Sequence, residues 1–341
     1  MPSDFSAVTR RFQDITSQIL DATDLPMYPD FCHYCGSTRS LSSAARYVRH
    51  QADLLTLARR SAADAVIVDA GCGFGLTLIV HALLGARAVH GVELSSGMVS
   101  TVEAYLPLLP PDVASRLTVT ATTVTAMPFD DESADIVLSV EAISHYLDVD
   151  GFIDEAWRVL RPDGVLIIAD RNNGSNPVMR RRAYDLWEAL ELGPPGRITP
   201  GGGRVDVPYA TRRAKVLADH FPSLSDADRD ELARTTSGFT KDEVLAATDA
   251  YIGEGVRPTA VYRRGQVAIQ PWGMAMERLF VPRELAHTVA SRGFEAKAYA
   301  YFGGASGNPA LRAANRVLSA MSVVTMPGAF SFRVIANKTT R

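Results

Sequence analysis

An acidic residue and three alternating glycines stand together in residues 68–75, which read VDAGCGFG and end an apolar run. A strand that ends there and turns into a helix presents free backbone N–H groups and the positive end of the helix dipole. Gly71, Gly73 and Gly75 carry no side chain, so a ligand can contact the backbone between them. The stretch therefore predicts a ligand site at the carboxyl end of a strand.

The acid in this stretch distinguishes two classes of cofactor. The dinucleotide pattern G-x-G-x-x-G needs a glycine where Leu76 stands here. Asp69 would repel a pyrophosphate but attract a cation. S-adenosylmethionine carries a sulfonium and an ammonium group and no phosphate, so these residues favour it over a nicotinamide dinucleotide.

Further motifs follow in order along the chain. Glu93 ends AVHGVE and begins ELSSGM, MPFDDESADIVLS spans residues 127–139, and WRVLRPDGVLIIAD spans 157–170. Together with VDAGCGFG, this set resembles the class I S-adenosylmethionine-dependent methyltransferases over residues 65–170 and again over 282–337. The resemblance implies that Glu93 pairs with both ribose hydroxyls and that Met98 lies against adenine.

The resemblance also implies the cofactor, S-adenosylmethionine, and its product, S-adenosylhomocysteine. The cofactor contacts that it implies are Asp69, Gly71, Cys72, Gly73, Gly75, Glu93, Leu94, Ser95, Met98, Thr123, Val124 and Glu141. Thr123 departs from the family pattern, because an Asp commonly stands four residues before the Leu-Pro-Phe stretch. A hydroxyl can still accept the adenine amino hydrogen bond, with a smaller gain than a carboxylate.

Methyl transfer to a hydroxyl needs a base that removes the proton. His145, in SVEAISHYLD, follows the expected fourth strand and is the candidate catalytic residue; the alternative is a histidine that bonds the backbone and shapes the pocket wall. Polar and aromatic residues beyond it are expected to contact the substrate: Tyr146, Arg171, Asn172, Trp187 and Trp272.

The elements that position these residues alternate between strand and helix from Ala65 to Asp170. This rhythm predicts an α/β fold with a doubly wound, mostly parallel, seven-stranded Rossmann-like sheet. Residues 1–64 are expected to form an N-terminal helical extension, with helices at 4–21 and 42–59. The core comprises 65–170 and 282–341. Residues 171–281 break the rhythm after the fifth strand and are expected to form a helical lid over the acceptor, its two ends close together.

The composition of the chain limits the kinds of partner that we expect. A formal charge of -3 offers no basic field for nucleic acid or a membrane, and no apolar run could span a bilayer. The N-terminus does not follow the layout of a signal peptide, so a cytoplasmic protein is expected, with a homo-oligomer possible. Cys32 and Cys35 form a C-x-x-C in a loop predicted from Pro26 and Pro29, without the further ligands of a zinc site. No metal is expected, and the acidic run 130–132 is interpreted as a solvated turn.

The favoured function is transfer of a methyl group to a small-molecule acceptor of secondary metabolism, with oxygen as the favoured atom. Alternatives are nitrogen or carbon methylation of a small molecule, methylation of RNA or protein, and a non-catalytic regulator that senses the cofactor. The arginine runs 180–182, 212–213 and 263–264 could hold a substrate anion, although solvated surface is the favoured interpretation.

Overall fold

The chain divides into two compact units, and each is described by itself. The computed structural model describes residues 5–22, 25, 31–171, 173–197, 206–259, 278–303 and 307–339. The first unit comprises Met1–Arg171 and Pro282–Arg341, and the second comprises Asn172–Val281. Asn172 and Trp272, two of the predicted substrate contacts, lie outside the described residues.

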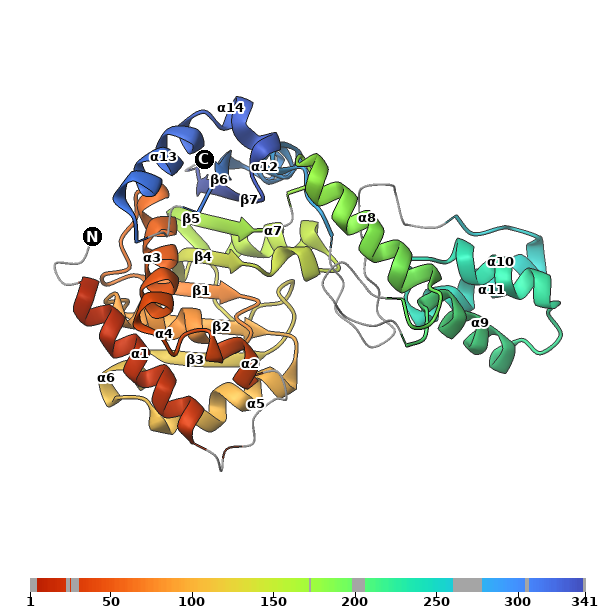
Figure 1. Ribbon diagram of the computed structural model, residues 1–341, viewed down its shortest axis with the longest axis horizontal. Coiled ribbons are helices and arrows are strands. Elements are labelled where there is room, and N and C mark those ends of the chain that lie inside the picture. The colour runs from red at the N-terminus through yellow and green to blue at the C-terminus, as the bar shows by residue number, and fades with distance from the viewer. Residues whose placement is uncertain are drawn as a thin grey trace. The chain divides into compact units, whose positions relative to one another are not determined.

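A seven-stranded sheet forms the centre of the first unit (Figure 1), with strand order β3-β2-β1-β4-β5-β7-β6. The strands β1 to β5 are parallel, and β7 is antiparallel to both β5 and β6. The predicted mostly parallel, doubly wound sheet is therefore confirmed. The strand bounds are β1 Val66–Ala70, β2 Ala88–Glu93, β3 Leu117–Ala121, β4 Ala134–Val140, β5 Leu160–Asp170, β6 Phe294–Tyr301 and β7 Ser331–Lys338.

The strand order reverses direction at β1, which pairs with β2 on one side and β4 on the other. Loops that leave neighbouring strands in opposite directions open a crevice at such a point, beyond the carboxyl ends of the strands. The helices of the core are α4 Leu76–Leu83, α5 Ser96–Tyr105, α6 Pro111–Ala114, α7 Val149–Val159 and α12 Pro282–Ser291.

The N-terminal helices pack into the same core as the sheet. Helices α1 (Phe5–Asp21) and α3 (Leu41–Leu57) confirm the two predicted helices within a few residues at each end. Their buried side chains, among them Phe12 and Val48, belong to one apolar cluster with Ile67 of β1. The N-terminal extension is therefore part of the first compact unit.

The C-x-x-C stretch forms a short helix, α2 (Phe31–Gly36), where a loop was predicted. The ring of Phe31 is buried and lies 5.4 Å from that of Phe74 and 6.0 Å from that of Tyr105, measured between centroids. These contacts with distant parts of the chain hold the turn in helical form. Cys35 is buried and Cys32 is exposed.

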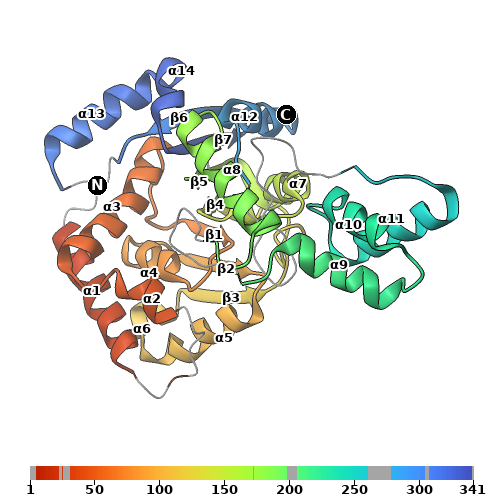
Figure 2. The same ribbon diagram turned by 45° about the vertical axis from the view of Figure 1, so that its right-hand side comes forward.

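Three helical elements lie between β6 and β7: α13 Pro309–Ala320, α14 Ser322–Thr325 and the 3₁₀ turn η3 Met326–Gly328. Helices α13 and α14 run alongside β6, the edge strand of the sheet, as Figures 1 and 2 show in blue. No helix in the described ranges is long and apolar enough to cross a membrane.

The second unit is helical in the parts that the structure describes, with α8 Pro177–Leu192, α9 Tyr209–His220, α10 Asp226–Thr235 and α11 Lys241–Glu254. Its two ends meet, because Asn173 and Phe280 form a β-bridge and Gly174 N–H donates to Phe280 O at 2.6 Å. The predicted closeness of these ends is confirmed. A small apolar cluster around Leu217 and Val244 joins α9, α10 and α11.

Candidate functional site

The glycine loop connects β1 to α4, and its three glycines serve two different purposes. All three have positive φ, at 73° for Gly71, 52° for Gly73 and 72° for Gly75. A Cβ atom on Gly71 would lie 2.6 Å from Cβ of Ala142, and one on Gly75 would lie 2.6 Å from the hydroxyl of Tyr105. A Cβ on Gly73 would meet no described atom within 4 Å. Packing therefore requires glycine at both ends of the loop, whereas Gly73 borders open space.

Asp69 and Glu93 place two carboxylates beside this loop. Asp69 is buried, and its Oδ2 atom has no hydrogen-bond partner among the described residues. Burial, followed by the negative charge of Glu93, raises the pKa of Asp69 to about 8. Glu93 accepts hydrogen bonds from the backbone N–H of Gly73 at 3.0 Å and of Ser95 at 2.9 Å.

A buried carboxylate oxygen without a partner suits a cationic ligand, and the open space at Gly73 suits close approach to the backbone. The residues therefore fit S-adenosylmethionine. Asp69 lies where a positive group would stabilise its ionised form. Two backbone N–H groups hold the carboxylate of Glu93 in place, and its oxygens can still accept hydrogen bonds from ribose hydroxyls.

The structure assigns different positions to the other predicted cofactor contacts. Cys72 is buried, and its sulfur packs against Gly91 of β2, so its backbone is the part that borders the loop. Ser95 caps α5, since its hydroxyl accepts from the N–H of Met98 at 3.3 Å. Met98 packs partly buried against the core, and Leu94 is exposed.

The turn that holds Thr123 and Val124 follows β3 and is tied to the end of β2. The N–H of Thr122 donates to the carbonyl of Glu93 at 3.0 Å. Thr123 is exposed, and its hydroxyl lies 3.0 Å from that of Thr125. The bond from Thr122 brings the turn next to Glu93, and the adenine contact at Thr123 stays a prediction.

His145 lies on a 3₁₀ turn, η2 (Ile143–His145), that packs against the glycine loop. Contact between Ala142 and Gly71 fixes the start of this turn. The N–H of Ser144 donates to Oδ2 of the buried Asp170 at 3.3 Å, which ties the turn to the end of β5. His145 is exposed, so the structure holds an accessible base candidate on a turn that is anchored to the glycine loop and to β5.

Tyr146 supports the loop instead of presenting its hydroxyl to a substrate. Its side chain is buried, and the hydroxyl donates to Ala70 O at 2.6 Å and lies 2.9 Å from the hydroxyl of Ser139. The prediction of a substrate contact at Tyr146 is corrected accordingly: a short buried hydrogen bond to the end of β1 makes it a positioning residue for the glycine loop.

Glu141 and Arg171 form an ion pair at the carboxyl ends of β4 and β5, with 2.7 Å between Nε and Oε2. Burial raises the pKa of Glu141, and the charge of Arg171 opposes that shift. Glu141 also has a positive φ of 55°, and its N–H donates to Ala169 O at 2.7 Å. A positive φ is uncommon for a residue other than glycine and costs free energy, so the surrounding contacts must hold Glu141 in this conformation.

Two residues near this edge were missed by the sequence analysis. The ring of Tyr34, in α2, lies 5.7 Å from the ring of Phe74 in the glycine loop. Burial is the main cause that raises the pKa of Tyr34, and the negative charge of Glu141 raises it further. Arg333 pairs with Ala169 across β5 and β7, is buried, and lies 3.9 Å from the ring centroid of Tyr301. Local sequence gave no signal for either, because both reach the edge through tertiary packing.

Residues of the second unit that the sequence analysis considered for substrate binding instead pack against other residues of the same unit. Trp187 packs against the buried Tyr209 and lies 6.2 Å from the ring of Tyr184. Arg213 is fully buried, forms an ion pair with Glu191 and donates from Nε to Ala233 O at 2.8 Å. The interpretation of Arg213 as solvated surface was therefore wrong. The run 263–264 lies outside the described residues.

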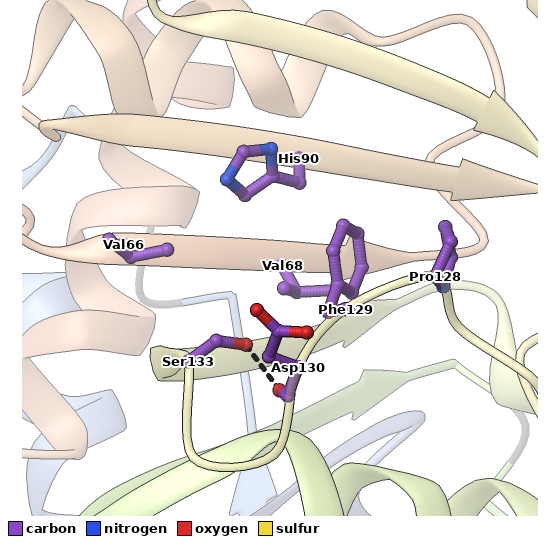
Figure 3. Close-up of a pocket in the computed structure, with 7 residues that line it drawn as sticks. All are labelled: Val66, Val68, His90, Pro128, Phe129, Asp130 and Ser133. Carbon is purple, nitrogen blue, oxygen red and sulfur yellow. Dashed lines mark hydrogen bonds between the residues drawn. The ribbon is translucent and has the colours of Figure 1, made fainter.

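A cavity of about 330 Å³ lies on the face of the sheet to which Val66 and Val68 point (Figure 3). Side chains along β1 alternate between faces, so Asp69 points the other way. His90 contributes to this cavity and lies 2.6 Å from the hydroxyl of Thr118. The cavity is therefore separate from the glycine loop. Within the described ranges, no group of three or more His, Cys, Asp or Glu residues could hold a metal ion.

The fold and the loop geometry together define a class I methyltransferase core, and comparison with known proteins agrees. Residues 68–168 match the methyltransferase domain family. A probable S-adenosylmethionine-dependent methyltransferase of Mycolicibacterium smegmatis is 31% identical over 42% of this chain and 56% of its own length. A ubiquinone biosynthesis O-methyltransferase of Bartonella tribocorum is 31% identical over 31% of this chain and 41% of its own length. The chain thus spans about half the length of these two relatives.

A third relative covers more of both chains. A probable S-adenosylmethionine-dependent methyltransferase of Mycobacterium tuberculosis is 32% identical over 244 residues, 71% of this chain and 72% of its own length. The chain belongs to the S-adenosylmethionine-dependent methyltransferases, and S-adenosylmethionine is its cofactor.

Proposed function

We propose that the protein transfers a methyl group from S-adenosylmethionine to an oxygen atom of a small-molecule acceptor, with His145 as the base. The observation that carries the proposal is the position of His145: an exposed imidazole on a turn whose first residue, Ala142, contacts Gly71 of the cofactor loop. The name of the Bartonella relative, an O-methyltransferase, is consistent with an oxygen acceptor.

S-adenosylmethionine supplies an electrophilic methyl group on a sulfonium. The residues of this chain would hold it through Glu93, the backbone at Gly73 and the charge of Asp69. His145 would accept the hydroxyl proton while the acceptor oxygen forms its bond to the methyl carbon and the methyl–sulfur bond breaks. Imidazole is the side chain used most often for this step near neutral pH.

The proposal also gives the second unit a role, which is to cover the acceptor. The chain enters it directly after β5, at the carboxyl end of the sheet, and returns to the core at α12. Covers that exclude water are common in such enzymes. If the proposal holds, S-adenosylhomocysteine together with an acceptor should slow proteolysis within residues 172–281; equal cleavage rates with and without them would contradict a covering role.

The test uses cofactor labelled on the methyl group and acceptors screened from a metabolite extract and a panel of phenols. His145→Ala should lower turnover by roughly 10²–10⁴ and leave the affinity for S-adenosylhomocysteine unchanged. His287→Ala, at an exposed histidine of α12, is the matched control and should keep full turnover. A loss of only a few fold in His145→Ala would assign that residue to the pocket wall.

Two other results would redirect the proposal. Transfer only to amine or carbon acceptors would replace oxygen as the methylated atom. Tight cofactor binding without transfer to any acceptor would favour the cofactor-sensing regulator.

A further inference from the structure

The cavity beside Val66 and Val68 lies next to a connection that carries no helix. Residues 122–133, all of which the structure describes, lead from β3 to β4 without one. Parallel sheets usually have helices on both faces. Here part of the cavity wall comes from the strands and the rest from this loop, at Pro128, Phe129, Asp130 and Ser133 (Figure 3). Its volume of about 330 Å³ is in the range of small-molecule sites.

Helix α7 holds this loop in place, so the cavity is preformed. Arg158 of α7 donates from Nη1 to Phe129 O at 2.8 Å and from Nη2 to Met127 O at 3.1 Å. Farther along the loop, the N–H of Ser133 donates to Val159 O at 2.9 Å. A ligand would not have to order this wall when it binds, and a preformed site therefore favours binding.

The interior of the cavity is apolar and carries two π faces. The ring centroids of His90 and Phe129 are 5.3 Å apart, and Val66 and Val68 lie beside them. A contact of 2.6 Å between Nδ1 of His90 and the hydroxyl of Thr118 fixes the imidazole. Burial lowers the pKa of His90, so the imidazole is mostly neutral at pH 7. A neutral imidazole does not repel a cation, and the face of an aromatic ring attracts one.

Asp130 supplies the negative charge of the cavity. The other two acids of the run 130–132 have cationic partners, since Asp131 pairs with Arg158 at 2.6 Å and Glu132 with Lys338 at 3.3 Å. Among the residues that the structure describes, the carboxylate of Asp130 has no ion-pair or hydrogen-bond partner. Figure 3 shows this carboxylate turned toward β1. The cavity thus combines a free negative charge with aromatic and apolar surface.

We propose that this cavity binds an organic cation, an amine with a flat apolar body. The ammonium group would lie against the carboxylate of Asp130, and the apolar body against Val68 and the ring of Phe129. An organic anion fits less well, because three acids follow one another in the loop. Val68 and Asp69 point to opposite faces of the sheet, so this site is distinct from the cofactor site and does not depend on the methyl acceptor.

The experiment titrates the full chain with three probes of similar shape: phenethylamine, the neutral phenethyl alcohol and the anion hydrocinnamate. The NMR signal of the His90 Cε1–H group, assigned with His90→Gln, reports binding at this cavity. The amine should bind about tenfold more tightly than the alcohol, through an exposed ion pair and a cation–π contact, and the anion should bind most weakly.

A charge-removing variant tests the role of Asp130. Asp130→Asn should lower the affinity for phenethylamine about fivefold, the effect of one exposed ion pair, and leave the affinity for the alcohol unchanged. Glu103→Gln, at an exposed acid of α5, is the matched control and should bind all three probes like the wild type. Thermal unfolding of each variant checks that a loss of binding does not come from a loss of folded protein.

Asp69 also favours a cation, so each titration is repeated with saturating S-adenosylhomocysteine. Binding of the amine should persist there, with the same shift of the His90 signal. Displacement of the amine by S-adenosylhomocysteine would assign it to the cofactor site and overturn the proposal. An unshifted His90 signal, equal affinities for the three probes, or wild-type affinity for the amine in Asp130→Asn would overturn it as well.

Discussion

Each unit of this protein buries an ionisable side chain, and the two units do so in opposite ways. In the first, Asp69 is buried beside the glycine loop with one carboxylate oxygen that has no described partner. In the second, Arg213 is buried with Glu191 as its ion-pair partner and Ala233 O as a further acceptor. A buried charge that has a partner is compensated within the fold, while a buried carboxylate without one costs free energy to ionise until a ligand supplies the opposite charge. The difference separates a structural role from a binding role.

The strongest test of this comparison breaks the paired charge. Glu191→Gln leaves the Arg213 guanidinium buried without its counter-charge, so the free energy of unfolding should fall by about 3–5 kcal/mol. The affinity for S-adenosylhomocysteine should stay the same. Chemical denaturation measures the first quantity and calorimetric titration the second.

Two matched variants control this measurement. Asp219→Asn breaks an exposed ion pair with Lys215 and should change the stability by less than about 1 kcal/mol. Replacing both Arg213 and Glu191 by Met and Leu should cost less than Glu191→Gln alone, since no charge remains buried. Wild-type stability in Glu191→Gln would remove the basis of the comparison.

Whether a region could be predicted from the sequence depends on how far apart in the chain its contacting residues lie. The sheet and the glycine loop could be predicted because alternating apolar runs and the spacing of Asp69, Gly73 and Glu93 are local patterns. The burial of Arg213 could not, since a pair of adjacent arginines is typical of solvated surface and its partner lies 22 residues away. Helix α2 was missed for the same reason: it depends on packing of Phe31 against Phe74.

The orientation of individual side chains was the least predictable property of the site. Tyr146 follows His145 directly, yet its hydroxyl bonds to Ala70 O while the imidazole of His145 is exposed. The resemblance to a family marks the turn as functional, but it does not decide which of its side chains face the ligand. The purposes of Gly71 and Gly75 likewise became apparent only from their contacts with Ala142 and Tyr105.

A second test separates packing from binding inside the glycine loop. Gly75→Ala would force a Cβ against the Tyr105 hydroxyl at a positive φ, so the free energy of unfolding should fall by about 1–3 kcal/mol. Gly73→Ala meets no such contact among the described atoms, so the positive φ is its main cost, about 1 kcal/mol. Cofactor affinity should nevertheless fall in Gly73→Ala, because the methyl group takes up space at the loop. Unchanged affinity there would show that Gly73 does not border the ligand.

The last expected effect is a pH dependence of cofactor affinity that comes from Asp69. In the free protein its pKa of about 8 keeps the carboxyl group protonated below pH 8. The cationic groups of S-adenosylmethionine favour the ionised form and so lower that pKa in the complex. Binding below pH 8 should therefore release up to one proton, and affinity should rise by up to about tenfold per pH unit until pH 8, then level off.

Calorimetric titration in buffers of different ionisation enthalpy measures this released proton directly. Asp69→Asn cannot ionise, so its affinity should be weaker and independent of pH over the same range. Asp53→Asn on α3 is the control: burial raises the pKa of Asp53 to about 6, so any proton linkage from it lies at lower pH and the slope toward pH 8 should persist. A flat affinity in the wild type would mean that the cofactor leaves Asp69 protonated. The unpaired oxygen would then not be a ligand site, and both Asp69 and the Arg213–Glu191 pair would have structural roles.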